Sequence, residues 1–248
     1  MTASDTQSTG TSSSEATGMS WLAIGGFVTG ILVVVAFLGE WLSPNPPNQG
    51  TLNFVASQSD LNLYAFRSFG WALYAIAAVP FFAMLGATLR PRNAQGASAA
   101  MMLTIVGVVL YALRGILMDA GWVAAGTLAP PTPMDASYQF WLLTVIATPL
   151  MPLGTAMLGL GLILFGILAR SSGLLPNWVC YVAFAAGVAG WLVFPALNYG
   201  AGDFIGYFFT ETLLPFLTAV FCFACGAIFL RRARLMNSGS APSPSGTS

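Results

Sequence analysis

The chain contains no histidine and no lysine, and only 6% of its 248 residues are charged. The missing histidines exclude histidine-ligated haem, di-iron centres with histidine ligands and Ser-His nucleophile systems within this chain. Three cysteines without histidine do not supply the four ligands of a structural zinc site. We therefore predict no metal and no cofactor. No nucleotide-binding fingerprint or catalytic set is recognisable, so enzymatic activity stays open but has no support.

The scarcity of charge also sets the fold class. A soluble domain carries about 25% charged residues, whereas this chain is 56% hydrophobic. Its apolar runs reach about 20 residues, the length that a hydrocarbon core of about 30 Å requires. An open sheet could not satisfy its edge groups in lipid. The sequence therefore predicts an all-α integral membrane protein, with the bilayer as its first partner and no basic cluster for nucleic acid.

Six apolar runs predict a six-transmembrane-helix bundle over residues 20–235, of unknown oligomeric state. Residues 1–19 and 236–248 are rich in Ser, Thr and Gly or Pro, cannot bury enough apolar surface to fold alone, and are predicted to be disordered tails. The predicted spans are about 21–42, 62–89, 97–118, 138–169, 178–197 and 204–230.

The placement of arginine predicts the orientation of the bundle. Arginines lie between spans two and three, between spans four and five, and after span six, which are all on one side of a six-span protein: Arg90, Arg92, Arg170, Arg231, Arg232 and Arg234. Arginine marks cytoplasmic connections, so both termini are predicted to be cytoplasmic. The connections on the other side contain acids and no basic residue: Asp60, Asp119, Asp135 and Asp203.

Arg114 places a charge inside span three, where an ionisable side chain needs a partner. The candidate partners are Glu40, Glu211 and Asp119, and Arg67 is a second cation. At about 1.5 Å of rise per residue, the two cations and the two glutamates fall in one layer near the outer face. We favour a bundle-facing pair between Arg114 and Glu211, whereas Arg67 and Glu40 could simply extend to water at helix ends.

The fourth span carries Thr148-Pro149-Leu150-Met151-Pro152 at the depth of this layer. Pro149 and Pro152 cannot donate to the carbonyls of Val145 and Thr148, and freed carbonyls near charges can form a polar pocket. The alternative is that the prolines only kink the helix. The excess length of this span fits either a kinked, tilted helix or a short outer helix before the crossing.

Small residues at helical spacing predict close helix packing. Gly26 with Gly30 forms such a surface, and so do Ala183 with Gly187 and Ala186 with Gly190; each could instead mark an oligomer face. The cysteines, including Cys222-Phe223-Ala224-Cys225, are interpreted as packing residues. Tryptophans near the predicted interfaces, where such rings gather, include Trp21, Trp71 and Trp178.

Several short motifs resemble those of an uncharacterised bacterial six-span family, domain of unknown function 4386. They are Gly39-Glu40-Trp41, Phe66-Arg67-Ser68-Phe69-Gly70, Leu113-Arg114 and Leu168-Ala169-Arg170-Ser171-Ser172-Gly173-Leu174-Leu175-Pro176. The resemblance covers most of residues 20–235, with one extra serine in the last motif. It implies the fold, a charged layer and a bacterial plasma membrane location, but no activity. Family members often carry His and Asp where this chain has Tyr138-Gln139-Phe140-Trp141, so no such role carries over.

Two functions are compatible with these residues. The first is a protein that binds or transports a small solute, an anion or a lipid headgroup in an outward-facing charged pocket. Its predicted ligand-binding residues are Glu40, Arg67, Arg114, Asp119, Thr148 and Glu211. The alternative is a structural or accessory membrane subunit whose buried ion pairs fix helix register and bind no ligand.

Overall fold

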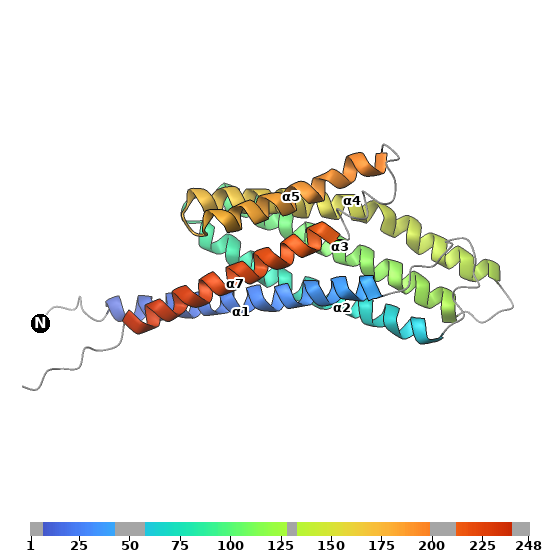
Figure 1. Cartoon of the computed structure of the whole chain (residues 1–248), viewed down its shortest axis with the longest axis horizontal. Helices are drawn as coiled ribbons and strands as arrows, with labels where there is room; N and C mark the ends of the chain where they lie inside the picture. The colour runs from blue at the N-terminus through green and yellow to red at the C-terminus, as the bar shows by residue number, and fades with distance from the viewer. Residues whose placement is uncertain (1–6, 43–57, 128–132, 199–211, 240–248) are drawn as a thin grey trace, which may run out of the picture.

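The computed structural model describes residues 7–42, 58–127, 133–198 and 212–239, and in these ranges all regular structure is helical. The all-α prediction is therefore confirmed. The helices run along the long axis of the bundle (Figure 1). They are α1 (Gln7–Leu42), α2 (Gln58–Leu89), α3 (Ala94–Thr127), α4 (Pro133–Ser171), α5 (Asn177–Asn198) and α7 (Leu214–Gly239).

Five of the described helices contain an apolar stretch long enough to cross a membrane, and α5 contains a shorter one over Asn177–Leu192. The outward face of the bundle is also apolar. The large hydrophobic side chains exposed on this face include Ile24, Phe69, Ile76, Met102, Ile167 and Phe216. Because so large an apolar surface is stable in contact with lipid rather than water, the protein is a helical membrane protein.

The helices close into a ring in which each packs against its neighbours along the chain. Helix α7 completes the ring by packing against α1 and, less extensively within the described residues, against α5. The hydrophobic core of the interior is made of aliphatic, aromatic and small side chains. Phe82 of α2, for example, stacks on Phe165 of α4 across the ring, with 5.9 Å between the ring centroids.

Glycines allow the most intimate helix pairs to form. A Cβ atom at Gly107 of α3 would lie 2.2 Å from the backbone nitrogen of Leu158 on α4, which no side chain tolerates. The predicted small-residue surfaces are used in the same way within the chain. Gly26 meets the backbone of Cys222 on α7, whereas Gly187 and Gly190 meet the backbone of α4. The prediction of packing inside the bundle is therefore confirmed for these glycines.

In each of the two connections that the structure describes, hydrogen bonds cap the end of an adjoining helix. Asn93 precedes α3 and accepts a hydrogen bond from the Gly96 amide at 2.8 Å, as an N-cap residue does. After α4, Gly173 adopts φ of +63°. The amide of Leu174 then donates to the carbonyl of Ala169 at 3.0 Å, which completes a Schellman motif.

One end of the bundle carries the exposed arginines, and we call it the arginine end. The α2–α3 and α4–α5 connections lie there, together with the first turns of α1 and the last turns of α7 (Figure 1). These segments hold Arg90, Arg92, Arg170, Arg231, Arg232 and Arg234, all exposed except half-buried Arg232. Cationic side chains therefore gather at one end, as the sequence predicts.

Both terminal helices are longer than the sequence predicts. Helix α1 begins at Gln7, inside the segment expected to have no structure, and α7 continues to Gly239. The reason is that α1 and α7 pack along each other. Ala16 and Ala233 are 3% and 2% exposed, so each helix gives the other an apolar contact that neither tail has alone.

The outer connection predicted at residues 119–137 is mostly helical, and the placement of Asp119 in a loop is wrong. Helix α3 continues to Thr127, and α4 starts at Pro133. Proline suits the first helical position because its missing amide hydrogen has no partner there in any helix. Helix α4 then runs without a break through Pro149 and Pro152, so span four is one continuous helix.

Candidate functional site

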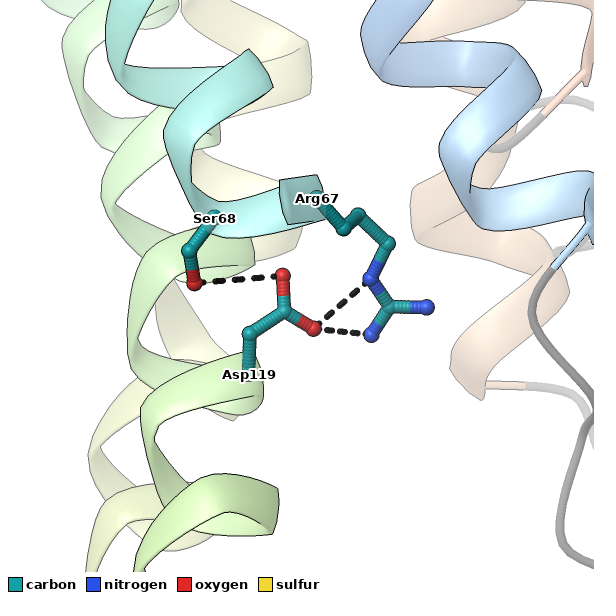
Figure 2. Close-up of polar contacts among 3 residues, drawn as sticks. All are labelled: Arg67, Ser68 and Asp119. Carbon is teal, nitrogen blue, oxygen red and sulfur yellow. Dashed lines mark hydrogen bonds and ion pairs between the residues drawn. The ribbon is translucent and has the colours of Figure 1, made fainter. Parts of the chain in front are cut away.

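Three polar residues meet where α2 packs on α3, in the half of the bundle away from the arginine end. Arg67 of α2 donates from Nε to Oδ1 of Asp119 on α3 at 2.7 Å, and its Nη2 also binds Oδ1. Ser68 donates to the other oxygen, Oδ2, over a long 3.4 Å. Figure 2 shows the arginine side chain folding back so that its guanidinium reaches the carboxylate. The two charges thus neutralise each other between two helices.

This ion pair is buried rather than extended into water. The side chain of Asp119 is fully buried, and that of Arg67 is only 11% exposed. Gly39 of α1 lies beside the arginine, since a Cβ atom there would be in ordinary van der Waals contact with Cγ of Arg67 at 3.5 Å. The alternative that Arg67 extends to water at a helix end is therefore wrong.

One helical turn deeper, the same two helices bury an indole. Trp71 follows Arg67 by four residues, and Gly115 precedes Asp119 by four, so each pair shares a helix face. A Cβ atom at Gly115 would lie 2.6 Å from Cδ1 and 2.9 Å from Nε1 of Trp71. The indole therefore lies flush on the α3 backbone. Tyr111 completes its surroundings with an edge-on ring at a centroid distance of 5.0 Å.

The Nε1–H group of Trp71 has no hydrogen-bond partner within the described part of the chain, although the residue is only 1% exposed. The hydroxyl groups of Thr29 on α1 and Thr218 on α7 are also buried without a hydrogen-bond partner in this part of the chain. Only the indole lies one turn, about 5.4 Å of helix, from the buried ion pair. We call Arg67, Ser68, Trp71 and Asp119 the polar cluster.

Sequence reasoning missed Ser68 and Trp71. It assigned Trp71 to the membrane interface, whereas the structure buries it beneath the ion pair. The signal that could have found it is the four-residue spacing from Arg67, matched by the four residues between Gly115 and Asp119. A glycine on one helix allows a tryptophan of the neighbouring helix to lie directly against its backbone.

Arg114 is half-buried and lies on a different face of α3 from Asp119. It follows Gly107 by seven residues, nearly two helical turns, and Gly107 packs on α4. Further along, a Cβ atom at Gly154 would lie 2.8 Å from the backbone nitrogen of Tyr111. Continuing this antiparallel register places Arg114 level with the Pro149–Pro152 segment of α4, whose prolines leave two carbonyls without a helical donor.

For the remaining predicted site residues, the structure describes no side chain. The side chains of Glu40 in α1 and Thr148 in α4 lie outside the described residues, and so does Glu211 altogether. The predicted pair between Arg114 and Glu211 therefore stays a prediction. What the described residues bring together is Arg67 with Asp119.

Comparison of the chain with family models, with curated proteins and with solved structures found no match. Function must therefore be inferred from the chemistry of the polar cluster.

Proposed function

We propose that this chain is a six-span protein of the bacterial plasma membrane with both termini in the cytoplasm. The five long apolar helices and the gathering of arginines at one end support this topology. The short apolar stretch of α5 would be the remaining crossing. Membership of the family called domain of unknown function 4386 stays a prediction from the motifs at Arg67, Arg114 and Arg170.

We propose further that the polar cluster binds a small polar solute, an anion or a lipid headgroup from the outer side. The observation that carries this proposal is the unpartnered, buried Nε1–H of Trp71 one turn from the Arg67–Asp119 pair. A buried donor without an acceptor costs about 1–3 kcal/mol. A bound acceptor oxygen would remove that cost and could at the same time approach the arginine and the serine.

The outer half of the bundle would add charge to such a site. Arg67 and Arg114 are the cations that would contact an anion, and Glu40 and Glu211 would balance them without one. Thr148 and the carbonyls freed by the α4 prolines would line the side next to Arg114. The ligand would compete with Asp119 for Arg67, so binding and the ion pair would be coupled.

A second candidate function is supported by the ion pair itself. Arg67 and Asp119 come from adjacent helices and are almost completely buried, which is the arrangement expected of a clasp that fixes helix register. In that case the protein would be a structural or accessory membrane subunit, and the cluster would take no ligand.

Thermal unfolding of the detergent-solubilised protein separates the two functions. We would add inorganic phosphate, acetate or glycerol 3-phosphate and compare wild type with Trp71→Phe, which keeps an aromatic ring but removes the donor. A ligand at 100 times its Kd stabilises by about 2.7 kcal/mol. For a chain of this size, that corresponds to a rise in Tm of roughly 5–11 °C.

Binding at the cluster predicts a saturable rise in Tm for wild type and at least a tenfold weaker response for Trp71→Phe. Trp21→Phe is the matched control, because Trp21 is 60% exposed and lies on α1 near the arginine end. If none of the probes stabilises wild type, or if Trp71→Phe responds equally, the ligand-binding function is rejected and the structural one stands.

A further inference from the structure

A groove opens between α4 and α5 at the arginine end, away from the polar cluster. Its volume is about 230 Å³, and it is lined by Gly166, Ile167, Arg170, Cys180, Tyr181 and Phe184. Ile167, Tyr181 and Phe184 are each about half exposed, so the groove lies on the outward, membrane-facing surface. Apart from the arginine, its walls are apolar or aromatic.

The arginine is held at the mouth of the groove. The guanidinium carbon of Arg170 lies 5.3 Å from the centre of the Tyr181 ring, within the range of a cation–π contact. No carboxylate pairs with Arg170 in the part of the chain described here, and its guanidinium lies against this ring instead. The guanidinium thus contacts the ring, while its N–H groups keep the geometry that binds phosphate.

The positions of these residues along α4 and α5 match the headgroup and the acyl chain of a lipid. Arg170 is in the last turn of α4, and the Gly173 cap ends that helix three residues later. Gly166 lies four residues before Arg170, about 6 Å farther from the arginine end. Trp178, 55% exposed, lies three residues from Tyr181 and marks the membrane interface. The groove therefore descends from a cation at headgroup level into an apolar channel at hydrocarbon level.

We propose that this groove binds one anionic phospholipid of the cytoplasmic leaflet, with its phosphate on Arg170 and an acyl chain along Ile167 and Phe184. The charge of the arginine complements the phosphate, and the apolar walls complement the chain. Anionic headgroups are attracted to basic residues at the cytoplasmic surface. A soluble anion would use only the arginine, and a zwitterionic lipid would lose most of the electrostatic attraction.

The test uses the full-length protein in detergent with phosphatidylglycerol or phosphatidylcholine added as mixed micelles. Bound lipid is counted by native mass spectrometry, and Tm is recorded in parallel. We expect one phosphatidylglycerol per chain, held at least fivefold more tightly than phosphatidylcholine. Glycerol 3-phosphate, which has the phosphate but no acyl chain, should not displace the lipid from the groove, whether or not it binds at the polar cluster.

Variants assign the binding to the groove. Arg170→Gln should lose the preference for phosphatidylglycerol, Arg170→Lys should keep part of it, and Ile167→Trp should block the lipid while keeping the charge. The matched control is Arg92→Gln, which removes an exposed arginine from the α2–α3 connection at the same end. It should bind lipid as wild type does.

Three results would overturn the proposal. The first is equal binding of the two phospholipids to wild type. The second is an equal loss in Arg92→Gln and Arg170→Gln, which would indicate diffuse attraction to the basic end. The third is unchanged binding in Ile167→Trp. Should Arg170→Gln fail to fold, Arg170→Lys and Ile167→Trp still decide the question, because both keep the cation.

Discussion

A single carboxylate, that of Asp119, is the centre of the polar cluster. It is fully buried on a helix whose membrane-facing residues are apolar, and a charge in such surroundings is costly without a partner. Arg67 supplies that partner from the neighbouring helix through two of its nitrogens. The consequence is an asymmetry, because losing either charge leaves the other buried without this counter-charge, whereas losing both removes the imbalance.

This asymmetry gives a double-mutant prediction. Arg67→Gln and Asp119→Asn should each lower the free energy of unfolding by about 3–5 kcal/mol, since each leaves an uncompensated buried charge. The double variant should recover most of that loss. Unfolding in mixed micelles, followed by circular dichroism, measures all three differences.

Ser68→Ala is the control for this cycle, because it removes only the long 3.4 Å hydrogen bond to Asp119. Its cost should stay below about 1 kcal/mol. Single variants as stable as wild type, or a double variant whose loss equals the sum of the two single losses, would show that the pair does not hold α2 and α3 together.

At the scale of the helices, the turn between α4 and α5 shows most clearly why the structure requires a particular residue. Gly173 needs its positive φ of 63° so that the amides of Gly173 and Leu174 can reach the last carbonyls of α4. Leu175, 4% exposed, then anchors the turn in the core. The turn fixes the end of α4, and with it the position of Arg170 at the mouth of the groove.

Replacing this glycine should therefore destabilise the protein although there is space for a side chain. A Cβ atom at Gly173 meets nothing within 4 Å, so the cost of Gly173→Ala is that of the left-handed backbone, about 1–2 kcal/mol. Gly18→Ala is the matched control. Gly18 also has open space around it but lies within α1, where alanine should stabilise by up to about 1 kcal/mol.

Thermal unfolding of the two variants under identical conditions compares these effects directly. We expect a lower Tm for Gly173→Ala and an unchanged or higher Tm for Gly18→Ala. If both substitutions shift Tm in the same direction, the backbone conformation at Gly173 does not limit stability.

At the scale of the whole molecule, the sequence predicts what depends on composition and periodicity. Long apolar runs give the helices, small residues such as Gly26 and Gly187 give the close contacts, and clustered arginines identify one end. The ends of the helices were less predictable. Helices α1 and α7 continue past their apolar runs because each covers the other, and that contact is invisible in either segment alone.

The choice of partner within the polar cluster was also beyond the sequence. Depth along each helix placed Arg67 and Arg114 in one layer but could not tell which acid each would meet. The rotation of α2 against α3 decides that, and close contacts such as Trp71 on Gly115 set the rotation. Asp119 was assigned to a loop because the apolar run stops at Met118, although α3 continues for two more turns.

The gathering of arginines at one end leads to a prediction about the whole molecule in its membrane. Because arginine is retained on the cytoplasmic side, the arginine end should face the cytoplasm. Cys180, Cys222 and Cys225 are at most 4% exposed, so their thiols should not react with a water-soluble reagent in the folded protein. Single cysteines at Asn93 and Ser238 should then react with a membrane-impermeant maleimide only in inverted vesicles. A cysteine at Thr51, between α1 and α2, should react in intact cells.

Labelling of Asn93→Cys in intact cells would reverse the topology and place the polar cluster on the cytoplasmic side. If Asn93→Cys and Ser238→Cys react from opposite sides of the membrane, the number of crossings between them is not even, which would contradict the six-span topology.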